Sequence, residues 1–358
     1  MSETIKNNVT RIHPSNTSAT FPSQFTQNSD IENILVNNMS LTANNWFRFQ
    51  SEWTYNAYKT LKDLDKYLIL IYLIQKTFKH YSDMFLIISE ESFYNLEKFE
   101  IEKINLIEIS EDLNIAKETV RRKINELNNS GIIERSGKKI VLRTETFTKQ
   151  RPVKTIKNLA NFLSFISRIL SEENKNIISS QIDAKELESF IRSNFSLIWK
   201  FYFRMQIPNL VDWRNYYGDL ETWAVAGTVL INQMHKIRDK YKGKGVIFDS
   251  DKLSNDEKFK KVYETALSKG GEITGVNASS ISEISGIPRA TVIRKLKQGI
   301  KMGVLEKDKN QLYIMKKLKV NKLKQFFDAG KSVQFRIYAF IGTFFDLYNN
   351  KEKMPKSK

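Results

Sequence analysis

Two short basic segments hold the side chains whose types and spacing could do chemistry. The first combines cations with a carboxylate and a hydroxyl, on Lys117, Glu118, Thr119, Arg121 and Arg122. The second has cations and a hydroxyl, on Arg289, Thr291, Arg294 and Lys295. On an α-helix inserted into a DNA major groove, guanidinium groups can donate to guanine and a carboxylate can accept from cytosine. We therefore interpret both segments as candidate recognition helices for double-stranded DNA.

Both segments lie within an internal repeat. Residues 105–142 align with residues 277–314 without a gap, and eleven of these 38 positions are identical. The identical pairs are Asn105/Asn277, Ile109/Ile281, Ser110/Ser282, Glu111/Glu283, Ile115/Ile287, Thr119/Thr291, Val120/Val292, Arg122/Arg294, Lys123/Lys295, Gly131/Gly303 and Glu134/Glu306. Because the match keeps a structural pattern, it indicates two copies of one supersecondary unit.

The first copy predicts two helices joined by a tight turn. Asn105 can cap the first helix by accepting from its leading N–H groups. Asn114 tolerates the left-handed angles of the turn, and Gly131 can end the second helix in the same conformation. The residues of the second helix expected to face inward are Val120, Ile124 and Leu127.

The second copy follows the same rules with different residues. Gly286 takes the turn position, Pro288 stands at the first turn of the second helix, and Gly303 ends that helix. The residues expected to face inward are Val292, Leu296 and Ile300. Ala290 and Gln298 are expected on the outward side together with the cations.

A short β-ribbon is expected after each second helix. Its strands are 132–135 and 140–142 in the first copy, and 304–307 and 312–314 in the second. Helix, turn, helix and ribbon make the layout of a winged helix. The ribbon lysines are placed to meet phosphates, which would position the unit without reading sequence. They are Lys138, Lys139 and Lys309.

The run 115–122, Ile-Ala-Lys-Glu-Thr-Val-Arg-Arg, resembles the recognition helix of the catabolite activator (cyclic-AMP receptor) family, whose pattern is Ser-Arg-Glu-Thr-Val-x-Arg. Both copies are similar to winged helix domains of bacterial transcription regulators. The resemblance implies base or phosphate contacts by Lys117, Glu118 and Arg122, and by Arg289 and Arg294. Ala290 replaces the acid in the second copy, so the two copies are expected to prefer different base sequences.

This resemblance covers about forty residues per copy. The phosphate-binding glycine pattern of the family's cyclic-nucleotide β-roll is missing, and the flanking segments have helical periodicity. The resemblance therefore implies contact with DNA, without a bound nucleotide.

Around the two copies the chain predicts a mostly α fold, in which two winged helix-turn-helix units with small β-wings are joined and flanked by helices. Glycine and proline number only 14 and 6, which favours helices over sandwiches or barrels. The segments with helical spacing of apolar residues are 46–81, 153–170, 187–205, 220–237 and 320–348.

These patterns predict four parts of the chain. Residues 1–40 are expected to form a disordered N-terminal arm, and 351–358 a basic tail. Residues 41–195 hold helices and the first winged helix, at about 103–143. Residues 196–350 hold helices, the second winged helix, at about 257–315, and a C-terminal helix. The polar stretch 240–256 is expected to connect the two larger parts.

The formal net charge of +17 favours a polyanionic partner. A basic composition inherited from an AT-rich genome is the alternative explanation of this charge. Cysteine is absent, so disulfides, thiolate metal sites and cysteine nucleophiles are excluded. The most apolar run, 67–74, is much shorter than the ~20 residues that a membrane span needs. We expect this run to be a buried helix and the protein to be cytoplasmic, associated with the nucleoid, without a membrane partner.

No motif predicts an enzyme. The three histidines, His13, His80 and His235, are scattered without metal-ligand spacing. The chain has no phosphate-binding loop and no nucleophile elbow. We expect no catalysis, no cofactor and no metal, and we interpret the aromatic helices as core or as a homodimer surface rather than a ligand pocket.

Three functions fit these observations. The first is a sequence-specific transcription regulator with two reading units in one chain. The second is a plasmid- or phage-type replication initiator, which also pairs two winged helix domains in a basic chain. The third is a winged helix protein–protein module, which would present an acidic or apolar outer face in place of the cations found here.

Overall fold

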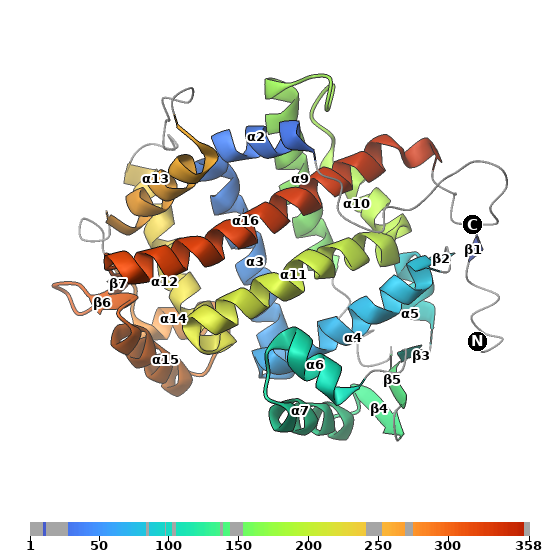
Figure 1. The fold of residues 1–358 in the computed structure, drawn as a ribbon, viewed down its shortest axis with the longest axis horizontal. Coiled ribbons are helices and arrows are strands. Elements are labelled where there is room, and N and C mark those ends of the chain that lie inside the picture. Colours follow the sequence, from blue (N-terminus) through green and yellow to red (C-terminus); the bar gives the residue numbers. More distant parts are fainter. Residues whose placement is uncertain are drawn as a thin grey trace.

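The computed structural model describes residues 10–11, 28–83, 86–96, 98–101, 105–136, 139–143, 153–240, 253–268 and 275–353. Long helices dominate the fold (Figure 1). The helices of the first half are α2 (Ser29–Asn37), α3 (Met39–Leu61), α4 (Leu64–Asp83), α5 (Glu90–Asn95), α6 (Leu106–Leu113), α7 (Lys117–Asn129) and α9 (Val153–Glu173). Those of the second half are α10 (Ala184–Ser193), α11 (Phe195–Tyr217), α12 (Leu220–Lys240), α13 (Asn255–Ser268), α14 (Ala278–Ser285), α15 (Arg289–Met302) and α16 (Val320–Asn349), followed by the short 3-10 turn η3 (Lys351–Lys353).

The described strands form three small antiparallel sheets. β1 (Thr10–Arg11) pairs with β2 (Leu86–Ile87), and β6 (Leu305–Lys307) pairs with β7 (Tyr313–Met315). The third sheet has the order β3-β5-β4, from β3 (Lys98–Ile101), β5 (Lys139–Arg143) and β4 (Ile133–Ser136). Phe99 pairs with Leu142, and Ile133 pairs with Leu142 from the other side, so β5 is the central strand.

Two helical hairpins with the same kind of turn organise the bundle. Lys62 (φ 56°) separates α3 from α4, and Gly218 (φ 82°) separates α11 from α12, both with left-handed backbone angles. An aspartate follows each of these residues and caps the next helix. Asp63 accepts from Lys66 N at 2.8 Å, and Asp219 accepts from Thr222 N at 2.7 Å.

The two hairpins pack against each other, and each helix of one hairpin contacts a helix of the other. α11 packs on α4, and α12 packs on α3. α16 runs alongside α11 across the face seen in Figure 1, and it also contacts α2. One hydrophobic core therefore joins buried residues from Ile31 to Tyr348, across both of the larger parts that the sequence predicts.

Aromatic side chains fill the centre of this core, where α3 meets α11. Trp53 stacks on Tyr202 with ring centroids 4.6 Å apart, and Phe49 meets the same Tyr202 ring edge-on at 6.1 Å. Phe340 of α16 approaches Tyr202 from a third direction at 5.6 Å. Tyr202, on α11, thus lies fully buried against α3 and α16.

Most of the predicted helical segments are helices, with different bounds. The segment 46–81 is two helices, because Lys62 and Asp63 end one and begin the next. The segment 187–205 is likewise divided at Asn194, between α10 and α11. The run 67–74 lies within α4, and its residues from Tyr67 to Leu73 are buried, as predicted.

The expected disordered arm ends earlier than residue 40. Residues 29–37 form α2, capped by Asn28, whose Oδ1 accepts from Ile31 N at 3.1 Å. Ile31, Leu35 and Val36 are buried, so the apolar spacing inside a polar segment is the signal that the prediction missed. Residues 1–9 and 12–27, most of the connection 240–256 and the end of the tail lie outside the described residues.

None of the helices described here has the length and apolar content that a membrane-spanning segment requires. Among the described residues, no three histidine, cysteine or acidic side chains are grouped so that they could hold a metal ion.

Truncation of Tyr202 tests whether the shared core controls folding. We expect Tyr202→Ala to lower the free energy of unfolding by about 3–5 kcal/mol, the usual cost of removing a buried aromatic ring. Tyr202→Phe should cost less than about 1 kcal/mol, because the hydroxyl lies 3.5 Å from both Gln50 and Gln206 and makes only long hydrogen bonds. Urea unfolding measures both values, and equal losses in the two variants would contradict the account.

Candidate nucleic-acid interface

Helices α6 and α7 form a helix-turn-helix whose turn is built by side chains that the sequence identified. Asn105 caps α6 by accepting from Ile107 N at 3.1 Å. Asn114 has φ 49° and ends α6, and Ile115 is buried directly after it. The Ser110 hydroxyl donates to Ile115 O at 2.7 Å and closes the turn. The predicted cap, turn and buried residue are therefore confirmed in the first segment.

Helices α14 and α15 repeat these contacts, with Gly286 in place of Asn114 at the turn. Asn277 accepts from Ser280 N at 2.8 Å, Gly286 has φ 70°, and Ser282 donates to Ile287 O at 2.7 Å. Gly131 and Gly303, both at φ 73°, follow α7 and α15 with the predicted left-handed angles. The two segments thus share one arrangement of caps, turns and helix ends.

The outward side of α7 carries most of the predicted reading residues. Lys117, Glu118, Arg121 and Arg122 are exposed, and Thr119 is half-buried. Arg121 pairs with Glu118 at 2.6 Å and Arg122 with Glu126 at 3.1 Å, each within the helix. Such exposed pairs contribute only about 0.2–1 kcal/mol, so a ligand that binds the guanidinium groups can displace them.

The outward side of α15 is basic without an acid. Arg289 and Arg294 are exposed, and Thr291 is half-buried. Arg289 Nε donates to Ser279 Oγ at 3.1 Å, which holds the guanidinium beside the first turn of α15. Lys297 and Lys301 extend the exposed basic side toward the end of the helix.

Lys295 does not belong to the outward side, and its assignment as a DNA contact is corrected. Its side chain is only 7% exposed, and Nζ lies 2.6 Å from Asp219 Oδ2. Lys123 occupies the same position on α7, is 9% exposed and pairs with Asp63. Gln298 is also turned inward, where Nε2 donates to Asp219 Oδ2 at 3.2 Å.

The signal for this burial is present in the helical spacing. Val292, Lys295, Leu296 and Gly299 are the buried residues of α15, and they follow the i, i+3, i+4, i+7 pattern of one helix face. Ile300, predicted to face inward, is 39% exposed and is a second correction. A Cβ at Gly299 would lie 2.7 Å from Leu305 Cδ1, so a larger residue there would require the Leu305 side chain to shift.

The strands after each helix pair differ in extent from the prediction. The first segment has three strands, because β3 precedes α6 and pairs with β5, so this segment begins before residue 103. In the second, Val276 makes a single bridge to Tyr313 in the corresponding place.

Two of the predicted wing lysines have no described side chain. Lys138 lies outside the described residues, and of Lys139 only the backbone, in β5, is described.

The turn between β6 and β7 is held by one carboxylate. Asp308 accepts from Gly275 N at 3.1 Å, Asn310 N at 2.8 Å and Leu312 N at 2.9 Å. These backbone hydrogen bonds lower the pKa of Asp308, so it is ionised at neutral pH. Lys309 is exposed at the tip of this ordered turn.

The two Lys–Asp pairs fix α7 and α15 to the bundle. Asp63 caps α4 and pairs with Lys123 of α7, and Asp219 caps α12 and pairs with Lys295 of α15. Burial acts to raise the pKa of Asp219, but the hydrogen bonds from Lys295 and from Thr222 outweigh it, and the pKa is lowered. Asp63 and Asp219 position α7 and α15, and the sequence did not single them out.

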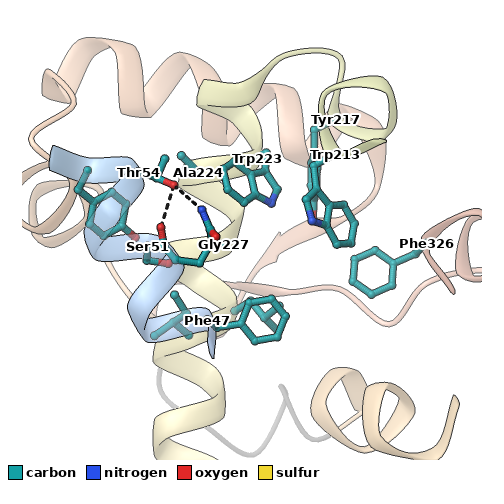
Figure 2. A pocket seen from close by; sticks show the side chains of 13 residues that line it. Phe47, Ser51, Thr54, Trp213, Tyr217, Trp223, Ala224, Gly227 and Phe326 are labelled. Carbon is teal, nitrogen blue, oxygen red and sulfur yellow. Dashed lines mark hydrogen bonds between the residues drawn. The ribbon is translucent and has the colours of Figure 1, made fainter. Parts of the chain in front are cut away.

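An aromatic pocket lies between α3, α11, α12 and α16. Figure 2 shows Phe47, Trp213, Trp223 and Phe326 around it, together with Thr54 and Gly227. The Thr54 hydroxyl donates to Gln50 O within α3 at 2.9 Å, and no charged residue is part of the lining. The pocket offers stacking surface and belongs to the aromatic core that the sequence predicts.

Removal of Lys295 tests the anchoring pair. We expect Lys295→Met to cost about 3 kcal/mol of unfolding free energy, because Asp219 is left half-buried without its cation. Lys297→Met, on the exposed side of the same helix, should change stability by less than about 0.5 kcal/mol. Because the folded pKa of Asp219 is lowered, the stability that it adds is present above its unfolded pKa and is lost as the pH falls through the folded value. The difference in unfolding free energy between wild type and Lys295→Met should therefore shrink below about pH 4. A difference that stays constant from about pH 7 to about pH 3 would contradict the assignment of the ion pair.

Comparison with known proteins bears on the first segment. Residues 100–137 match the family of DeoR-like helix-turn-helix domains, from inside β3 to the end of β4. Neither the curated proteins nor the solved structures give a significant match. The matched segment is about a tenth of the chain, and it supports a DNA-binding helix-turn-helix of the kind found in bacterial regulators.

Proposed function

We propose that this protein is a transcription regulator that binds specific sequences of double-stranded DNA with two winged helix units. The observation that carries the proposal is the exposed basic side of α7, presented after the left-handed turn at Asn114, within the segment that matches DeoR-like helix-turn-helix domains. A helix presented in this way can enter a major groove, with its first turn closest to the base edges.

The order of elements supports the assignment of the first unit. After α4, β2 and α5 come β3, α6, α7, β4 and β5, and β3 pairs with β5. The β4–β5 hairpin is the wing of this unit. The corresponding elements of the second unit are α12, α14, α15, β6 and β7. The Val276–Tyr313 bridge lies where β3 pairs with β5 in the first unit.

Base reading is assigned to the first turns of the two recognition helices, from Lys117 and Arg289 onward. In the first unit, Lys117 and Arg122 donate hydrogen bonds to base edges and Glu118 accepts one from a base. Arg121 and Thr119 contact bases or phosphates. In the second unit Arg289 and Arg294 donate. The wings add phosphate contacts through Lys138, Lys139 and Lys309.

The same arrangement disfavours a protein–protein module. A surface that binds a protein partner usually has few lysines in its centre. Here exposed lysines lie on both candidate surfaces, Lys117 on α7 and Lys297 and Lys301 on α15. A replication initiator remains the second candidate, because one basic chain holds both reading units. Origin repeats in the bound DNA would favour it over a regulator.

The cellular location follows from the proposal. A protein that binds chromosomal sequences is expected in the cytoplasm, associated with the nucleoid.

A homodimer through the aromatic helices stays a separate prediction. The two units of one chain could bind two DNA sites without a second copy of the protein.

Substitution of one arginine in each unit tests the proposal. Arg122→Ala and Arg294→Ala should each weaken specific binding by about 1–3 kcal/mol, which is the value of one good base contact. Arg168→Ala is a matched control, because Arg168 also forms an exposed pair with the glutamate four residues on, Glu172 at 3.2 Å, but lies on α9. A fluorescence anisotropy titration with the preferred duplex measures the three affinities. Unchanged affinity in the Arg122→Ala/Arg294→Ala double variant would refute the assignment of these helices.

The salt dependence of binding separates DNA from protein partners. Each phosphate that a cation neutralises adds about −0.9 to the slope of log K against log salt. We expect a steep negative slope for a duplex of random sequence. A slope near zero would remove both DNA-binding functions and leave the protein–protein module.

A further inference from the structure

The turns of the two helical hairpins meet at one end of the bundle. Leu64 N, in the first hairpin, donates to Glu221 Oε1 of the second at 2.9 Å. Arg214 Nε, near the end of α11, donates to Asp65 Oδ1 at the start of α4, also at 2.9 Å. We call this contact between residues 62–65 and residues 214–221 the turn seam. Its ion pair is largely buried, with Arg214 19% and Asp65 17% exposed.

Both recognition helices are attached beside the turn seam. Lys123 of α7 pairs with Asp63, and Lys295 of α15 pairs with Asp219. Because each aspartate belongs to a hairpin turn and the turns touch, the two helices share one end of the bundle. Figure 1 agrees, with α7 and α15 both along the lower edge.

Each helix-turn-helix also contacts the hairpin of the other half. Asn114, in the first unit, accepts from Arg214 Nη1 through its carbonyl oxygen at 3.1 Å, and its side chain donates to Asn215 at 2.8 Å. Gly286, in the second unit, has the Lys59 side chain of α3 packed directly against it. The end of α11 thus supports the first turn, and the end of α3 supports the second.

These contacts are reciprocal at every level. α4 packs on α11 while α12 packs on α3, and α6 meets α11 while α14 meets α3. The residues correspond as well, because Asp219 follows Asp63 by 156 positions and Asn215 follows Lys59 by the same 156. Each half of the chain therefore contacts the other half through equivalent elements. Such reciprocal contacts are characteristic of a two-fold axis.

We propose that an internal two-fold axis relates the two units and that the chain reads two half-sites in inverted orientation on one duplex. This inference rests on the proposed function and specifies its substrate. Operator symmetry mirrors protein symmetry, so a two-fold relation requires inverted rather than direct half-sites. The half-site centres are separated by about one helical turn, 10–10.5 base pairs, or a multiple of it, and the turn seam holds that separation constant.

The two half-sites differ in sequence. Glu118 corresponds to Ala290, and Arg121 corresponds to Ile293, so the acceptor and one cation of the first unit are missing from the second. The preferred DNA is therefore an imperfect palindrome. A symmetric homodimer of single-unit chains would select a perfect one.

Selection from random DNA tests the orientation. The full chain is incubated with a pool of duplexes carrying about 40 random base pairs, long enough for two half-sites, and the bound fraction is sequenced. The inference predicts two unlike half-sites, inverted and at one fixed spacing. Direct repeats, or a single half-site, would overturn it while leaving the proposed function intact. Loss of all sequence preference would instead refute the proposed function.

Two exchanges then assign each half-site to its helix. Glu118→Ala should change the base preference in one half-site only, and Ala290→Glu should change it in the other half-site only. If either substitution changes both half-sites, or if both change the same one, the internal symmetry is wrong. Circular dichroism checks that each variant is folded before binding is measured.

The seam itself is tested with a spacing series. Insertion of about 5 base pairs moves one half-site to the opposite face of the duplex and should lower wild-type affinity at least tenfold. Arg214→Met removes the contacts to Asp65 and Asn114 and should reduce this penalty to less than threefold. Arg336→Met is the matched control, because it removes a half-buried pair with Asp212, 2.6 Å long, that joins α16 to α11 and not the two hairpins. Equal penalties in wild type and Arg214→Met would contradict the role of the seam.

Discussion

The orientation of α7 and of α15 depends on one ion pair each, between a buried lysine and the aspartate that caps a long helix. A lysine so little exposed is costly unless its charge is paired, so Lys123 and Lys295 must stay in contact with Asp63 and Asp219. This requirement fixes the rotation of α7 and α15 about their own axes. Arg122 and Arg294 are turned outward as a result, because they lie away from the buried face of their helices. Lys117 and Arg289 are exposed as the first residues of α7 and α15.

The rest of the molecule positions these two pairs. The left-handed residues Lys62 and Gly218 let each long helix reverse directly before its aspartate. The aromatic core around Tyr202 holds the two hairpins together, and the turn seam fixes one aspartate relative to the other. Under the proposed function, this bundle is a rigid spacer between two reading units, which suits recognition of DNA with a constant distance between half-sites.

Much of the candidate site could be predicted because it depends on local rules. Asn114, Gly286, Gly131 and Gly303 were identified from the backbone angles that their positions require, and all four have them. Lys295 was misplaced because a cation on a helix is usually exposed, and its partner is distant in the sequence. The hairpin contacts and the early start of the first unit, at β3, depend on pairing between distant segments, which helical periodicity alone does not reveal.

Hydroxyl-radical footprinting of the wild-type protein on its selected duplex tests the central claim most directly. The account predicts two protected patches on one face of the DNA, about one helical turn or a multiple of it apart. With Arg294→Ala, one patch should weaken while the other stays. A single patch in the wild type, or equal loss of both patches in the variant, would contradict the presentation of two independent reading helices by one bundle.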